Sequence, residues 1–218
     1  MTVRNQSFVS PELRSRIRGL AVPVALGLGR LGLSPNALTV LGFAGTCLAA
    51  VAAAAQQWVI AGVLLLVFGI FDLFDGALAR ATGRTSKFGA FLDSTLDRTG
   101  ENLVLAAVAY GCAAAGFSLG AGLAALALAL ASVVTYARAK AEVIGLHGEV
   151  GIAPRPERLV VLAAGLVVGG AVGIGAPFFP GAGRPWLALA LGIISITSGI
   201  TVIQRIVHVR RQLNEGAK

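Results

Sequence analysis

The segment DLFDGALAR (residues 72–80) is followed, eight residues later, by GAFLDSTLD (residues 89–97). Four of the ten acidic residues of the chain lie in these two segments, and long apolar runs flank them. Carboxylates close to a membrane interior are costly and usually have a function. This stretch therefore bears on both the fold and the chemistry of the protein.

The composition indicates an integral membrane protein. The chain has 218 residues, of which 56% are hydrophobic and 13% are charged, whereas a soluble domain carries about 25% charged residues. Several apolar runs approach the length of about 20 residues that a membrane-spanning helix needs. We therefore expect an all-α membrane protein that forms a single domain over residues 1–218.

Six transmembrane helices are predicted, preceded by an N-terminal amphipathic helix at the membrane interface. In that first helix, residues 10–31, apolar residues recur every three or four positions with arginines between them, a pattern suited to the headgroup region of an anionic leaflet. The predicted spans are residues 37–55, 58–80, 88–115, 121–143, 157–175 and 186–207.

Basic residues are distributed unevenly about these spans. Of 18 Lys and Arg residues, only Arg184 falls on the side opposite the two termini. Basic residues favour the cytoplasmic side, so we expect the termini and the carboxylates to face the cytoplasm across the cell membrane. This asymmetry also accounts for the net charge of +8 without a nucleic-acid partner.

The four carboxylates are predicted to form one site. Asp72 and Asp75 share a helix face, as do Asp93 and Asp97. A short loop joins the two antiparallel helices, so the two pairs lie at similar depth. Carboxylates this close repel one another, and oxygen-rich sites favour hard cations. We predict two Mg²⁺ ions, or Mn²⁺, that clamp a phosphoryl group.

Two glycines and an arginine add to this site. Gly76 and Gly89 lack side chains and leave room beside the metals, while Arg80 offers a fork for phosphate. A divalent-metal transporter is the alternative of another class, because transporters also use intramembrane Asp. A conduction path would need polar groups deeper in the bilayer, and the spans offer few.

The pattern D-x-x-D-G-x-x-A-R-x8-G-x3-D-x3-D, met at every fixed position, resembles the CDP-alcohol phosphotransferase family. The resemblance implies that an alcohol attacks the lipid-side phosphorus of CDP-diacylglycerol and that CMP leaves. It implies that Asp72, Asp75, Asp93 and Asp97 bind metal and that Asp97 is also the general base. The residues it implies for CDP-lipid binding are Ser34, Pro35, Asn36, Gly76, Ala79, Arg80, Ser86 and Gly89.

The acceptor alcohol is the open question. The basic residues near spans four and five, which are Arg138, Lys140, Arg155 and Arg158, suit an acceptor that carries its own phosphate, although positive-inside anchoring also explains them. The segments around them are similar to the bacterial phosphatidylinositol phosphate synthases of this family, which implies inositol 1-phosphate. Phosphatidylglycerophosphate synthesis from glycerol 3-phosphate stays open as the alternative.

Two further features of the sequence indicate a role less clearly. Glu101 lies one turn beyond Asp97 and either orients a neighbour, such as a metal ligand or Arg98, or is a structural acid paired with an arginine. Gly165, Gly169 and Gly173 repeat every four residues and could allow close helix packing. The expectation of a homodimer rests mainly on the family resemblance.

Overall fold

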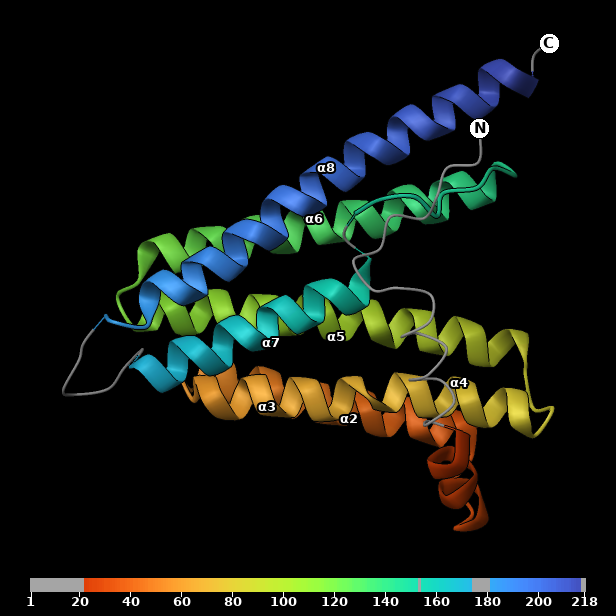
Figure 1. The fold of residues 1–218 in the computed structure, drawn as a ribbon, viewed down its shortest axis with the longest axis horizontal. Helices are drawn as coiled ribbons and strands as arrows, with labels where there is room; N and C mark the ends of the chain where they lie inside the picture. The colour runs from red at the N-terminus through yellow and green to blue at the C-terminus, as the bar shows by residue number, and fades with distance from the viewer. Residues whose placement is uncertain (1–21, 153, 174–180, 217–218) are drawn as a thin grey trace.

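Long apolar runs give long helices in this chain (Figure 1). The computed structural model describes residues 22–152, 154–173 and 181–216, and the side chain of Asp72 lies outside this description. The labelled helices are α2 (Pro35–Ala54), α3 (Trp58–Gly69), α4 (Phe71–Ala81), α5 (Lys87–Ala114), α6 (Ser118–Val143), α7 (Arg155–Val172) and α8 (Arg184–Gly216).

Each predicted span overlaps one or two of these helices, but not all of the helices are equally apolar. Among the described residues, four stretches are long and apolar enough to cross a membrane: Pro35–Ala54, Trp58–Ala81, Ser118–Val143 and Arg184–Glu215. Helices α5 and α7 are less apolar because they carry the charged residues of the candidate site, including Asp97 and Glu101 on α5 and Arg155 and Arg158 on α7. That all six segments cross the membrane therefore stays a prediction.

The second predicted span contains a local interruption at Ile70, a residue that keeps helical dihedral angles. Residues 58–80 were expected to be continuous, whereas α3 ends at Gly69 and α4 begins at Phe71. Glycine has a low helix propensity and often stands where a helix is interrupted. The interruption lies directly before the carboxylate segment.

Residues 22–30 are helical and lie across the long axis of the bundle, near the start of α2 (Figure 1). The predicted amphipathic helix covers residues 10–31, of which residues 10–21 lie outside the described part of the chain. The interfacial role of this helix stays a prediction.

Two serines set the starts of the helices that frame the candidate site. The Ser34 side chain caps α2 by accepting a hydrogen bond from the Ala37 N–H at 3.1 Å, and Pro35 occupies the first helical turn. The Ser86 side chain caps α5 in the same way, accepting from the Gly89 N–H at 2.9 Å. Both caps satisfy backbone donors that the first helical turn leaves unpaired.

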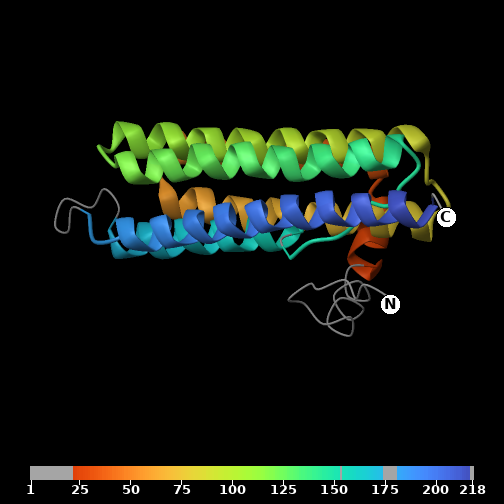
Figure 2. The same cartoon turned by 90° about the horizontal axis from the view of Figure 1, so that it is seen from above.

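Helix α2 is the central packing partner at this end of the bundle. It packs against α3, α4 and α5, while α6 packs against α5 and α8, and α7 packs against α3 and α8. Figure 2 shows α5 and α6 on one side of the bundle and α7 and α8 on the other. The two carboxylate-bearing helices, α4 and α5, are therefore brought together around the beginning of α2.

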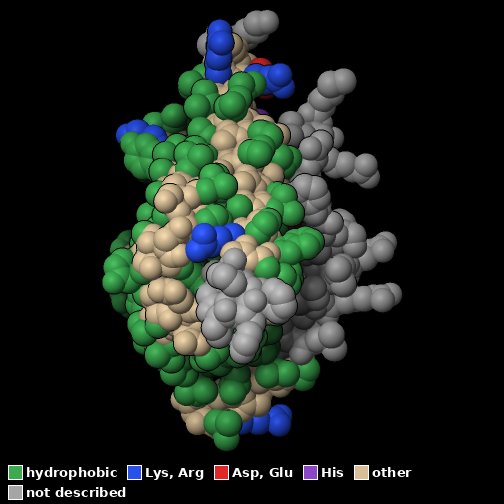
Figure 3. Space-filling model, turned by 90° about the vertical axis from the view of Figure 1, so that its left-hand side faces the viewer, with side chains coloured by type: hydrophobic (Ala, Val, Ile, Leu, Met, Phe, Trp, Pro, Cys, Tyr) green, Lys and Arg blue, Asp and Glu red, His purple; other side chains and the backbone are tan. Residues whose placement is uncertain are grey.

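The outer surface of the bundle is apolar. Val51, Ile196 and Ile203 are each more than 60% exposed, and such large exposed apolar surfaces mark contact with a membrane or a partner. Figure 3 views the end farthest from the carboxylates and shows hydrophobic side chains over much of the described surface, with few basic ones. The bundle thus has a charged end and an apolar end.

Matched glycine substitutions test the packing of α5. A methyl group at Gly111 would overlap the Ala53 carbonyl and lie 2.8 Å from the Trp58 ring, whereas one at Gly122 meets nothing within 4 Å. We expect Gly111→Ala to lower the free energy of unfolding by about 1–3 kcal/mol. Gly122→Ala should be neutral or stabilising by up to about 1 kcal/mol. Thermal unfolding in detergent measures both, and equal midpoints would contradict this packing.

Candidate active site

A polar cavity of about 190 Å³ lies where α2 and α5 begin and α4 ends. It brings together most of the residues predicted to bind a CDP-lipid, which are Pro35, Asn36, Gly76, Ala79, Arg80, Ser86 and Gly89. Ser34, the remaining one, precedes them as the cap of α2. Two predicted metal ligands, Asp75 and Asp93, also line the cavity.

Asp75 is held by a residue that the sequence interpretation missed. The Thr39 hydroxyl lies 2.7 Å from Asp75 Oδ2 and donates to it, and both side chains are buried. Thr39 is three residues after Asn36 and so lies on the same face of α2. That spacing was the available signal, but only the contact of α2 with α4 shows which carboxylate Thr39 faces.

Gly89 lies at a close contact between two helices. A Cβ atom there would be 3.0 Å from Ser86 Oγ and 3.1 Å from Asn36 Oδ1. These distances are tighter than ordinary van der Waals contact. Gly89 therefore allows Asn36 and Ser86 to approach α5 at the cavity wall, in addition to leaving room for a ligand.

Two ion pairs connect α5 to α7 beside the cavity. Arg155 Nη1 lies 2.5 Å from Asp97 Oδ2, and both side chains are about one-fifth exposed. One turn further, Arg158 contacts Glu101 through two hydrogen bonds of 2.8 and 2.9 Å, and this pair is buried. Glu101 thus pairs with an arginine, the structural alternative considered for it.

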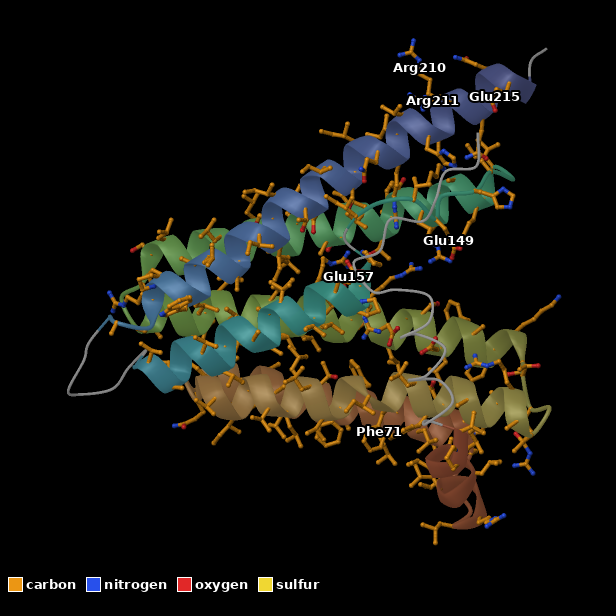
Figure 4. The ribbon with its side chains drawn as sticks, viewed as in Figure 1. Phe71, Glu149, Glu157, Arg210, Arg211 and Glu215 are labelled. Carbon is orange, nitrogen blue, oxygen red and sulfur yellow. The ribbon has the colours of Figure 1, made fainter. Side chains whose placement is uncertain are left out.

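The four predicted acceptor-binding residues lie in different environments. Arg138 and Lys140 are at the solvent-exposed end of α6, where Arg138 pairs with Glu142 and Glu149. Figure 4 shows Glu149 in the connection between α6 and α7. Arg155 and Arg158, by contrast, point to the acids of α5.

Arg205 is a buried arginine that the sequence interpretation did not single out. It is 8% exposed, and it donates hydrogen bonds to the Val150 carbonyl at 3.0 Å and to the Val134 carbonyl. The signal was present, because Arg205 lies inside the predicted span 186–207, where an ionisable residue is unusual.

Among the described side chains, no group of three or more Asp, Glu, His or Cys residues is placed to hold a metal ion. Asp72, the fourth predicted ligand, lies on α4, and its side chain is outside the description. The two-metal centre accordingly stays a hypothesis drawn from the spacing of the carboxylates.

The fold and the cavity define a helical membrane protein with a polar, carboxylate-lined site at one end. The sequence profile of the CDP-alcohol phosphatidyltransferase family matches residues 32–196, and the chain belongs to this family. This family assignment places the protein among the transferases and does not support the transporter alternative.

Curated relatives agree with the family. The chain is 39% identical over 191 residues to the phosphatidylinositol phosphate synthase of Cutibacterium acnes, covering 87% of this chain and 91% of the relative. It is 34% identical over 211 residues to the archaetidylinositol phosphate synthase of Pyrococcus horikoshii, covering 94% and 98%.

A solved structure is similar over most of its length. The phosphatidylinositol phosphate synthase of Mycobacterium tuberculosis, crystallised with CDP-DAG bound, superposes with a TM-score of 0.76 at 30% identity, covering 87% of this chain and 92% of that one. The same enzyme in complex with manganese and citrate superposes with a TM-score of 0.75.

The buried ion pair gives a stability prediction. Removing one partner of a buried pair leaves an uncompensated charge and typically costs about 3–5 kcal/mol. We expect Arg158→Met to show such a loss, and the double variant Glu101→Leu with Arg158→Met to recover most of it. A double-mutant cycle from unfolding in detergent measures the coupling, and additive effects would contradict the pairing.

Proposed function

We propose that the protein transfers the phosphatidyl group of CDP-diacylglycerol to a phosphorylated polyol, for which inositol 1-phosphate is the best candidate. The products are phosphatidylinositol phosphate and CMP. The observation that carries the proposal is the polar cavity at the end of α4, because six of the eight motif positions line it, including Asp75 and Asp93.

The named relatives support the choice of acceptor. One is a phosphatidylinositol phosphate synthase and the other an archaetidylinositol phosphate synthase. Their names differ in the lipid part and agree on inositol phosphate. Inositol 1-phosphate is therefore favoured over glycerol 3-phosphate, the acceptor considered as the alternative.

Asp97 is suited to the proton transfer. In the proposed reaction, an acceptor hydroxyl oxygen attacks the lipid-side phosphorus of the diphosphate, and the bond from that phosphorus to the bridging oxygen breaks. The bridging oxygen leaves with CMP, and the Asp97 carboxylate takes the hydroxyl proton. A positioned general base of this kind contributes typically about 10²–10⁴-fold to a rate.

Arg155 connects this base to the proposed acceptor site. Its guanidinium contacts Asp97 at 2.5 Å, so an acceptor phosphate bound at Arg155 would lie close to the base. We assign Arg138, Lys140 and Arg155 to the acceptor phosphate, since guanidinium and ammonium groups bind phosphate well. Arg158 is instead paired with Glu101, and this buried ion pair keeps α7 beside α5.

The predicted metal ligands fit a divalent cation by their chemistry. Asp72, Asp75, Asp93 and Asp97 supply only carboxylate oxygens, the donors that Mg²⁺ and Mn²⁺ prefer. A similar enzyme has been solved with manganese. Two such ions, when bound, would neutralise the carboxylates and polarise the transferred phosphoryl group. We propose Mg²⁺ as the ion used, with Mn²⁺ as a substitute.

The orientation in the membrane follows from the distribution of charge. We propose that all six predicted spans cross the cell membrane, with both termini and the active site on the cytoplasmic side, and that the N-terminal helix lies on the anionic leaflet. The loop after α4 and the connection between α6 and α7 both lie at the charged end of the bundle (Figure 1). We also propose a homodimer, on the strength of the family.

An acceptor panel tests the proposed function. Purified protein with CDP-diacylglycerol and Mg²⁺ should release labelled CMP with inositol 1-phosphate, and much less with glycerol 3-phosphate, free inositol or serine. Chelation of the metal should abolish release. Release with glycerol 3-phosphate alone would establish the other acceptor, and no release with any alcohol would refute the transferase proposal.

Substitution of the base gives a second prediction. Asp97→Asn keeps the size of the side chain and removes its basicity, so turnover should fall by about 10²–10⁴-fold, while binding of CDP-diacylglycerol persists. Glu215→Gln, an exposed acid-to-amide change at the end of α8, is the matched control and should keep full activity. Normal turnover by Asp97→Asn would show that the base lies elsewhere.

A further inference from the structure

A second cavity, of about 320 Å³, lies between the 22–30 helix and the end of α4. It is distinct from the polar cavity described above, although Pro35 and Arg84 line both. None of the family motif residues 72, 75, 76, 79, 80, 89, 93 and 97 lines it. Its role is therefore not explained by the binding of the CDP group.

The wall of this cavity is built by close packing. A Cβ atom at Gly29 would lie 2.7 Å from Leu78 Cδ1, so the 22–30 helix packs closely on the Leu78 side chain of α4. Ala25, Leu38, Ala77 and Leu78 form a small buried cluster beneath it. Phe71, labelled in Figure 4, packs against the same cluster. The 22–30 helix is thus anchored on α4 by an apolar contact.

The lining combines apolar and cationic groups. Leu26, Leu33 and Leu78 supply apolar surface, whereas Arg30 and Arg84 supply two guanidinium groups that are exposed at the charged end of the bundle. A cavity that combines apolar surface with two cations matches an amphiphile that has an anionic head and a hydrocarbon chain. Guanidinium groups bind phosphate oxygens with paired hydrogen bonds.

We propose that this cavity is a binding site for a resident anionic glycerophospholipid, separate from the lipid substrate. One acyl chain lies along Leu26, Leu33 and Leu78, and the headgroup phosphate lies between Arg30 and Arg84. A zwitterionic lipid binds less well, because its ammonium group would face the same two cations. Basic residues are generally attracted to an anionic leaflet, and here two of them bind one lipid molecule in a defined cavity.

The position of Arg84 connects this lipid to the active site. Arg84 lines both cavities. A lipid phosphate bound to its guanidinium in the second cavity would therefore restrict how the same side chain contacts a ligand in the polar cavity. The lipid would also hold the 22–30 helix against α4. This consequence rests on the proposed function, whereas the lipid site itself does not.

Lipid titration followed by native mass spectrometry tests the site. The full chain in detergent, without metal or acceptor, is titrated with dioleoyl phosphatidylglycerol and separately with dioleoyl phosphatidylcholine. We expect one phosphatidylglycerol to bind about 10-fold more tightly than phosphatidylcholine. Arg30→Gln should weaken phosphatidylglycerol binding about 10-fold, as expected for a lost charge-assisted hydrogen bond, and weaken phosphatidylcholine binding less, because the repulsion of its ammonium group is lost as well.

Two further variants make the test specific. Arg210→Gln removes an exposed arginine of α8 that does not line the cavity, and it should bind both lipids normally. Leu26→Trp fills the apolar part and should weaken both lipids while the charge is kept. Equal binding of the two lipids, or an equal loss in Arg210→Gln, would refute the site. Displacement of phosphatidylglycerol by one equivalent of CDP-diacylglycerol would assign the cavity to the substrate instead.

Discussion

The pairing of α5 with α7 through charged side chains organises the candidate site. Helix α5 packs mainly on α2 and α6, and α7 packs mainly on α3 and α8. Between them, Arg158 reaches Glu101 with two hydrogen bonds in a buried setting, and Arg155 reaches Asp97 one turn away. Charges in an apolar bundle need such partners because desolvation is otherwise too costly.

This constraint explains why the proposed base and the proposed acceptor site are neighbours. The buried Glu101–Arg158 pair fixes the position of the beginning of α7 along α5. Arg155, one turn earlier on α7, consequently lies beside Asp97. Helix α2 also packs on α5 and supplies Asn36 to the cavity and Thr39 to Asp75. The cavity for the CDP-lipid and the group of basic residues therefore meet at α5.

The far end of α8 belongs to the same arrangement. Arg205 donates to carbonyl groups of α6 and of the connection that precedes α7. Gln204 accepts a hydrogen bond from the Ile152 N–H at 3.2 Å, and Gln212 both accepts from and donates to the backbone of His147. These contacts hold the 144–152 segment against α8, and this segment leads into Arg155. The basic end of α8 is thus part of the support for the site.

The sequence alone determined the helices, the charged end of the chain and the motif, because these depend on local spacing. Apolar runs predict the approximate extent of α2 and α5, and spacings of three and four place the Asp residues on shared faces. Gly69, in contrast, was not recognised as the end of a helix, because the apolar run continues through it.

Only the tertiary structure decided which groups face one another. Thr39 and Asp75 are 36 residues apart, Glu101 and Arg158 are 57 apart, and Arg205 is 71 residues from the Val134 carbonyl. Their contacts depend on how α2, α5, α7 and α8 pack, and no local pattern encodes that packing. The second cavity has the same origin, since it exists only because the 22–30 helix packs on α4 through Gly29 and Leu78.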